Sequence, residues 1–316
     1  RDGRIAAQFS AGTVFRETAP GNWRFAPLHE APPVQPAPEL CVLLSTSGTT
    51  GSPKLVRLSR GNIESNAASI AEYLGIRPDD RAITTLPPFY SFGMSVINSH
   101  LYAGATLLLT EGSVATDEFW RFFQAEAATS FSAVPFTFDV LERIGFRSRQ
   151  YPSLRYIAQA GGRMPEPRVR EYAQWAKSSG KELFVMYGQT EAGPRMAYVP
   201  PKLLPDNREC IGVAIPGGAF ELHDDNGQHV TQADQPGELV YRGPNVMMGY
   251  AESPADLALG AGPGVLHTGD LACRNAAGLY YIVGRKSRFS KIVGLRISLD
   301  EIERWLSTHG VGGIVS

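Results

Sequence analysis

Cysteine is scarce in this 316-residue chain, and the three that occur, Cys41, Cys210 and Cys273, lie far apart. No CxxC pair or other metal-ligand spacing connects them, so the sequence contains neither a disulfide framework nor a thiolate metal motif. Free or buried thiols in a reducing compartment are expected, which favours a cytoplasmic location.

Long apolar runs and an excess of one charge are also missing. No stretch is apolar over the length of a bilayer, and the initial RDGRIAAQ has no secretory apolar segment. The formal net charge of −1 gives no electrostatic reason to expect nucleic acid or an anionic membrane as a partner. Because the chain does not begin with methionine, we expect its natural N-terminus to lie further upstream.

Glycine and hydroxyl residues, by contrast, are concentrated in TSGTTGSPK, from Thr46 to Lys54. Apolar LCVLL precedes this run and the alternating LVRL follows it, which predicts a β-hairpin with the run at its tip. Glycines let the backbone approach a ligand, and successive N–H groups, hydroxyls and a lysine can all donate to an anion. We interpret the run as a phosphate-binding loop, with an ordinary turn as the alternative. A Walker P-loop is excluded, because Lys54 follows Pro53 and precedes Leu55.

Strand-like and helix-like segments alternate from Leu40 to Met186. This alternation predicts an α/β fold with a parallel or mixed sheet covered by helices. Ligands of such sheets bind beyond the carboxyl ends of the strands. The phosphate loop, the turn Gln159–Gly162 and the loop after Met186 all follow strands, so we expect them on one edge.

The pattern changes at about Pro194, where short strands separated by glycine-containing turns replace the helical periodicity. This predicts a small β-rich subdomain. A charged junction follows Gly284, and the capping box Ser298–Glu301 predicts a helix over EIERWL. Near the beginning of the chain, six prolines between Pro20 and Pro38 predict an extended connector.

The segment YGQTEAG, Tyr187 to Gly193, is the second candidate for chemistry. An aromatic ring such as Tyr187 can stack on a purine. Thr190 and Glu191 offer oxygen ligands that suit Mg²⁺ held between protein and phosphates. The alternative is a strand-terminating loop with a solvated glutamate.

The third candidate is HTGDL, in which Asp270 follows a glycine. A carboxylate at that place can accept two hydroxyls, as ribose recognition requires. The alternative is a common Gly-Asp turn. We expect His267 in the same segment to be structural rather than catalytic.

Together these motifs resemble the adenylate-forming (AMP-binding) superfamily, which includes acyl-CoA synthetases, peptide-synthetase adenylation domains and luciferases. TSGTTGSPK resembles its phosphate loop, YGQTE its Tyr-Gly-x-Thr-Glu segment, and TGD its Thr-Gly-Asp segment. Gly284 to Glu303 resembles its hinge between a large domain and a mobile lid, although Ser287 stands where relatives often have Asp or Lys. The motifs follow the family's order over about Leu40 to Glu303.

The resemblance implies roles for individual residues. Tyr187 would stack on adenine, Asp270 would bind the ribose hydroxyls, and Arg285 would contact the ribose. Lys291 matches a lysine that acts in only one orientation of the lid. The nucleotide-binding residues implied are Thr46, Ser47, Gly48, Thr49, Thr50, Gly51, Lys54, Ala160, Gly161, Gly162, Tyr187, Gly188, Gln189, Thr190, Asp270 and Arg285. The catalytic residues implied are Lys54, Thr190, Glu191 and Lys291, with Glu191 as the Mg²⁺ ligand.

The acyl pocket is expected at Tyr90, Ser91, Phe92 and Gly93. Many acyl-activating relatives have a histidine where this chain has Tyr90. Relatives that activate amino acids usually have an aspartate for the substrate ammonium, and here Ser91 takes that position. No carboxylate occurs between Asp80 and Glu111. Because burying an unpaired ammonium is costly, the sequence favours a carboxylic acid without an α-amine.

The resemblance therefore implies ATP- and Mg²⁺-dependent conversion of a carboxylic acid to an acyl-adenylate. The acyl group would then pass to a thiol of CoA or of a carrier-protein pantetheine. The alternatives are an amino-acid adenylation domain and a catalytically silent nucleotide-binding relative. We expect residues 1–286 to form the large AMP-binding domain, α/β to about 193 and β-rich from 194, and residues 287–316 to begin an α+β lid. Since the family's lid lysine lies well beyond the hinge, we expect a chain truncated at both ends that binds nucleotide but adenylates poorly.

Overall fold

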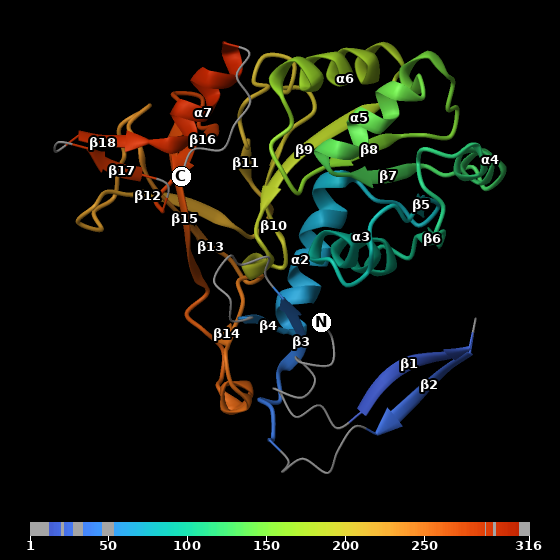
Figure 1. Ribbon diagram of the computed structural model, residues 1–316, viewed down its shortest axis with the longest axis horizontal. Coiled ribbons are helices and arrows are strands. Elements are labelled where there is room, and N and C mark those ends of the chain that lie inside the picture. The colour runs from blue at the N-terminus through green and yellow to red at the C-terminus, as the bar shows by residue number, and fades with distance from the viewer. Residues whose placement is uncertain are drawn as a thin grey trace.

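The computed structural model describes residues 13–19, 22–27, 34–45, 54–287, 289–292 and 295–309. The expected phosphate loop from Thr46 to Pro53 lies outside these residues. The largest sheet has seven strands in the order β11-β10-β9-β8-β7-β5-β6 (Figure 1). Its strands are β5 (Arg81–Ile83), β6 (Thr106–Leu108), β7 (Ser130–Ala133), β8 (Tyr156–Gln159), β9 (Glu182–Gly188), β10 (Arg195–Val199) and β11 (Val213–Ala214). Strands β5 to β9 run parallel, and β10 and β11 add antiparallel partners.

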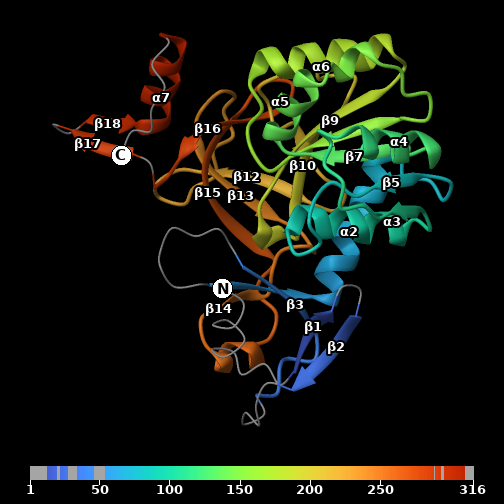
Figure 2. The same ribbon diagram turned by 45° about the vertical axis from the view of Figure 1, so that its right-hand side comes forward.

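Helices cover both faces of this sheet, as both views show (Figures 1 and 2). They are α2 (Arg60–Leu74), α3 (Ser91–Tyr102), α4 (Asp117–Ala125), α5 (Pro135–Arg143) and α6 (Glu166–Ser178). Successive side chains of a strand point to opposite faces, so Ile157 packs into the core under α4 to α6 while Tyr156 and Ala158 pack under α2 and α3. The predicted mixed α/β sheet covered by helices is confirmed.

Strands β10 and β11 follow the change of sequence pattern at Pro194 but still belong to the large sheet. The apolar run RMAYV in β10 folds back and pairs antiparallel with β9. The β-rich region therefore begins further along the chain, in a four-stranded antiparallel sheet. Its strands are β12 (Ala219–His223), β13 (Gly237–Arg242), β15 (Val265–Arg274) and β16 (Tyr280–Arg285).

The predicted hairpin around the phosphate loop is present as β3 (Leu40–Ser45) and β4 (Leu55–Ser59). It does not join the large sheet. Instead β14 (Gly249–Ala251) pairs with β4 and completes a separate three-stranded sheet. This pairing places Tyr250 and Glu252, which are distant in the sequence, beside Lys54.

Two further hairpins and short 3-10 turns complete the described residues. They are β1 (Thr13–Ala19) with β2 (Asn22–Pro27), β17 (Phe289–Ile292) with β18 (Leu295–Ser298), and η1 (Phe146–Ser148), η2 (Thr190–Ala192) and η3 (Pro254–Ala258). The extended connector predicted from Pro20 is wrong for Asn22–Pro27, which is paired strand. The helix predicted over EIERWL is present as α7 (Leu299–Thr308), while the division into 1–286 and 287–316 stays a prediction. Within the described part of the chain, no helix combines the length and apolarity that a bilayer crossing needs.

Candidate functional site

A cavity of about 1190 Å³ lies beyond the carboxyl ends of β8 and β9 and extends to β15 and β16. It is where ligands of open α/β sheets bind. Of the predicted site residues, it brings together Tyr90, Ser91, Phe92, Ala160, Gly161, Gly162, Tyr187, Gly188, Gln189, Thr190, Glu191, Asp270 and Arg285. Lys54 and Gly93 lie outside its lining, and the side chain of Lys291 in β17 lies outside the described residues.

Asp270 is the centre of the polar network on the β15 side of the cavity. Its side chain is only 5% exposed. Asp270 Oδ1 accepts a hydrogen bond from Arg285 Nε at 2.8 Å. Asp270 Oδ2 accepts from the Tyr187 hydroxyl at 2.5 Å and from Gln189 Nε2 at 3.1 Å. Three predicted nucleotide-binding residues therefore converge on a fourth.

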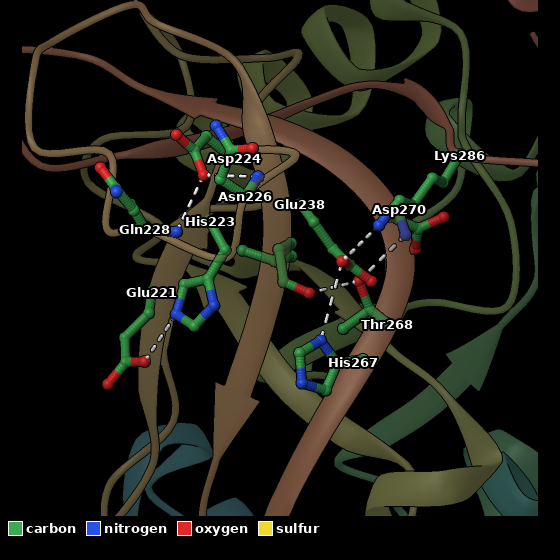
Figure 3. A network of polar contacts seen from close by, with 11 residues as sticks. Glu221, His223, Asp224, Asn226, Gln228, Glu238, His267, Thr268, Asp270 and Lys286 are labelled. Atoms are coloured by element: carbon green, nitrogen blue, oxygen red, sulfur yellow. Dashed lines mark hydrogen bonds and ion pairs between the residues drawn. The ribbon is translucent and has the colours of Figure 1, made fainter.

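The local backbone explains why Asp270 is held so firmly. Asp270 and Arg285 are directly opposite each other in the β15–β16 pair. The Thr268 hydroxyl donates to the Leu239 carbonyl at 2.7 Å and accepts from the Asp270 N–H at 3.1 Å. Gly269 between them has a φ of +70°, which a side chain would disfavour. Figure 3 shows Thr268 beside Asp270 on β15.

Tyr187 keeps its proton in this arrangement. Burial, and then the neighbouring Asp270 carboxylate, raise the pKa of Tyr187 well above its usual value. A neutral phenol can donate to Asp270, and its ring remains part of the cavity wall. An aromatic face beside a buried carboxylate is a suitable site for a nucleoside, because a base can stack and ribose hydroxyls can donate.

Thr190 and Glu191 lie on η2, directly after β9. The Thr190 and Ser91 hydroxyl oxygens are 3.2 Å apart, which joins η2 to the beginning of α3. Glu191 Oε1 accepts from the Tyr250 hydroxyl at 2.8 Å, while Oε2 has no partner among the described residues. Mg²⁺ usually takes one or two carboxylates together with substrate phosphates, so a half-exposed carboxylate on the cavity wall fits such an ion.

Tyr250 lies between Lys54 and Glu191. The Lys54 ammonium lies 5.8 Å from the centre of the Tyr250 ring and 2.8 Å from Glu252 Oε1. The β14–β4 pairing produces this contact, because it places Tyr250 opposite Val56. Lys54 is therefore one side chain away from Glu191, although it does not line the cavity.

The predicted acyl side of the cavity contains Tyr90, Ser91 and Phe92. A Cβ atom on Gly161, whose φ is +78°, would lie 2.6 Å from the Tyr90 hydroxyl oxygen. Glycine thus allows the Tyr90 side chain to close over the turn after β8. Gly93 has a packing function, because a Cβ there would meet the Pro87 carbonyl oxygen at 2.2 Å.

Arg195 also lines the cavity, and the sequence alone did not single it out. It is 1% exposed, and its guanidinium carbon lies 4.2 Å from the centre of the Phe92 ring. Burial lowers the pKa of Arg195. The signal that was available is an arginine at the beginning of the otherwise apolar strand RMAYV.

The face of β12, β13 and β15 shown in Figure 3 carries a second polar cluster. His267 is 62% exposed and its Nδ1 lies 3.7 Å from Glu238 Oε2, which Lys286 also contacts at 2.9 Å. Burial raises the pKa of Glu238, but the Lys286 ammonium and His267 hold it below its usual range. His267 also lines the cavity, and its structural role stays a prediction.

Glu221, His223 and His229 on the same face offer donor atoms within 4.8 Å of one another, a spacing that a metal ion can bridge. Glu221 Oε1 also accepts from Arg242 Nε at 2.9 Å, so its charge is already balanced. None of the three lines the cavity.

The chain is similar to known proteins over most of its length. The model of the family described as AMP-binding enzyme matches residues 6–251. The 2-succinylbenzoate–CoA ligase of Bacillus pumilus is 30% identical over 283 residues, which are 87% of this chain and 56% of that protein. The indoleacetate–CoA ligase of Aromatoleum aromaticum is 32% identical over 263 residues, 83% of this chain and 50% of that protein.

Among solved structures, the O-succinylbenzoate coenzyme A synthetase of Bacillus subtilis in complex with ATP and magnesium superposes with a TM-score of 0.72. It is 28% identical, and the match covers 85% of this chain and 55% of that one. The chain thus belongs to the AMP-binding enzyme family and has the fold of adenylate-forming enzymes. It spans about half the length of the curated relatives it matches.

Proposed function

We propose that this chain forms the nucleotide- and acid-binding part of an ATP-dependent acid–thiol ligase. The observation that carries the proposal is the single cavity in which Asp270, Arg285 and Tyr187 meet Glu191 and an aromatic acyl side. The curated relatives named above are CoA ligases, which supports CoA as the thiol. A carrier-protein pantetheine remains the alternative acceptor, and the cytoplasm remains the proposed location.

Each residue has a task that its chemistry suits. Asp270 accepts the ribose hydroxyls, Arg285 donates to the ribose, and the Tyr187 ring packs against the adenine. Thr190 donates to the phosphates, together with the loop Thr46–Lys54. Glu191 would hold Mg²⁺, which neutralises phosphate charge when bound. Ala160, Gly161, Gly162, Gly188 and Gln189 complete the wall around the nucleotide.

The reaction proceeds in two steps. A carboxylate oxygen of the acid attacks the α-phosphorus of ATP, and the bond from that phosphorus to pyrophosphate breaks. The thiolate of CoA then attacks the acyl carbon, and the bond from that carbon to AMP breaks. The protein contributes mainly positioning and charge neutralisation, with Lys54 near the phosphates and Lys291 brought in by the lid.

An amino acid is a poorer substrate on the same physical grounds. An α-ammonium on the acyl side would face Ser91, which carries no charge, and the buried Arg195 cation. A like charge in a low-dielectric wall is repulsive. This supports an acid without an α-amine over the peptide-synthetase alternative.

The test is ATP–pyrophosphate exchange by the full-length protein over matched pairs of acids with and without an α-amino group. We expect exchange with acids that lack the amine, and CoA-dependent release of AMP with the same acids. Exchange restricted to amino acids would establish the alternative function. AMP binding without any exchange would indicate a silent relative.

A further inference from the structure

Arg195 is a buried cation for which the described part of the chain provides no carboxylate. Its Nη1 contacts the Tyr73 hydroxyl at 3.4 Å and the Met186 sulfur, and its Nε has no hydrogen-bond partner. None of the salt bridges among the described residues includes it. Burying an unpaired charge is expensive, so such a residue requires a compensating partner.

The backbone of Arg195 is fixed from two sides. Its carbonyl accepts from Asn66 Nδ2 at 3.0 Å and from Asn245 Nδ2 at 2.9 Å. On the neighbouring strand, Gly188 leaves the room that Pro194 needs, since a Cβ there would come within 1.7 Å of the Pro194 carbonyl oxygen. The backbone that carries the guanidinium is therefore held in place before any ligand arrives, which lowers the entropic cost of binding.

The guanidinium lies on the acyl side of the cavity. Its carbon lies over the Phe92 ring, and Phe92, Tyr90 and Met186 all line the cavity. The ribose-binding pair Asp270 and Arg285 belongs to β15 and β16 instead. An acid attached to the nucleotide would extend away from that pair, and its far end would approach Phe92 and Arg195.

We propose that the acid carries a second carboxylate and that Arg195 binds it, so that the substrate is a dicarboxylic acid. This inference rests on the proposed function. The Phe92 ring lies against the guanidinium in this structure. The second carboxylate would accept from Nε, the donor that has no hydrogen-bond partner among the described residues. A planar guanidinium that has an N–H group without an acceptor matches a carboxylate in shape and charge.

Stable acyl-adenylate analogues test this inference: the N-acylsulfamoyl adenosines of straight-chain dicarboxylic acids from succinic to suberic acid. Each is paired with its terminal amide, which has the same shape without the charge. Isothermal titration calorimetry compares the two members of each pair. We expect at least one carboxylate to bind about 10- to 100-fold more tightly than its amide, the strength of a hydrogen bond to a charged group.

Arg195→Met and Arg195→Lys show whether Arg195 causes this preference. Arg195→Met should abolish it, Arg195→Lys should retain part of it, and AMP affinity should stay as in the wild type. The matched control is Arg57→Met, because Arg57 is also buried but donates to the Met248 and Leu259 carbonyls outside the cavity.

Two results would overturn the inference. One is equal binding of carboxylate and amide at every chain length in the wild type, a comparison that needs no variant. The other is a preference that survives Arg195→Met. Failure of the proposed function is distinct, since the wild type would then catalyse no ATP–pyrophosphate exchange with any acid, whichever member of a pair binds more tightly.

Discussion

Arg285 donates to Asp270 across the β15–β16 pair, with 2.8 Å between Nε and Oδ1. The register of two neighbouring strands thus places a cation and a nearly buried carboxylate at one wall of the cavity. The second carboxylate oxygen of Asp270, Oδ2, accepts hydrogen bonds from Tyr187 and Gln189. Ribose hydroxyls would compete for the same lone pairs.

Asp270→Asn should weaken AMP and ATP binding alike by about 10- to 100-fold, because a hydrogen bond to a charged acceptor is worth about 1.5–3 kcal/mol. Calorimetry with AMP, and with 2′-deoxy-AMP on both proteins, measures the effect. Removing the 2′-hydroxyl should cost affinity in the wild type and little more in the variant. Glu221→Gln, which loses an ion pair with Arg242 outside the cavity, is the control. Unchanged AMP affinity in Asp270→Asn would contradict the ribose assignment.

Glu191→Gln should remove the Mg²⁺-dependent part of ATP affinity and leave AMP affinity unchanged. The amide keeps the shape of the side chain and can still accept from Tyr250, but it is a much weaker ligand for a hard cation. ATP titrations with and without Mg²⁺ measure the difference. Glu209→Gln is a suitable control, because Glu209 lines the same cavity and pairs with Arg163. If both variants retain the Mg²⁺ effect, the ion is held elsewhere.

Gly161→Ala should destabilise the protein by more than Gly180→Ala. Both glycines have positive φ, at +78° and +66°, so each alanine costs about 1–2 kcal/mol in backbone strain. Only Gly161 has close neighbours, since the added Cβ would lie 2.6 Å from the Tyr90 hydroxyl and 3.0 Å from Val134 Cγ1, whereas nothing lies within 4 Å at Gly180. Urea unfolding should show an excess loss at Gly161. Tyr90→Phe should restore part of that excess, and no restoration would mean that the contact is relieved in another way.

Asp80 should make stability depend on pH in the acid range. Burial raises the pKa of this carboxyl, but hydrogen bonds from Arg155, the Arg77 N–H and Thr129 outweigh burial and lower the pKa below its usual value. A lowered folded-state pKa stabilises the protein above the unfolded value of about 3.9, and this contribution disappears as the pH falls through the folded value. Thermal unfolding measured from pH 7 to pH 2 should show that this contribution to stability is lost below about pH 4.

Asp80→Asn isolates that contribution. At pH 7 it should cost about 3 kcal/mol, because it leaves Arg155 without its buried partner, and it should flatten the acid limb of the profile. Asp79→Asn changes the exposed neighbouring carboxylate and should do neither. An acid limb that is equally steep in Asp80→Asn would assign the pH dependence to other groups.

Parts of the fold whose signal is local can be predicted from the sequence. The alternation of strands and helices to Met186, the hairpin of β3 and β4 and the helix α7 follow from short-range periodicity and turn chemistry, and all three are present. The segments YGQTE and TGD each follow or form a strand, so their approximate place at the cavity was also readable. These features depend on residues that are close together in the chain.

Contacts that join segments distant in the chain could not be predicted from the sequence. Nothing in RMAYV indicated that β10 would extend the large sheet, and nothing in GYA indicated that β14 would pair with β4. For the same reason Tyr250 was not expected between Lys54 and Glu191. Side-chain packing and the closing of long loops decide such pairings, and neither has a local sequence signal.

The sequence by itself determined which chemical groups are present: a carboxylate after Thr-Gly, a tyrosine and a glutamate after a buried strand, and an acyl side without an acid. Only the tertiary structure decided which of them share a cavity, and that Asp270 meets both Arg285 and Tyr187. It alone showed Arg195 as a buried charge without a carboxylate among the described residues. Burial and pairing depend on three-dimensional neighbours, since the same arginine in an exposed strand would be hydrated.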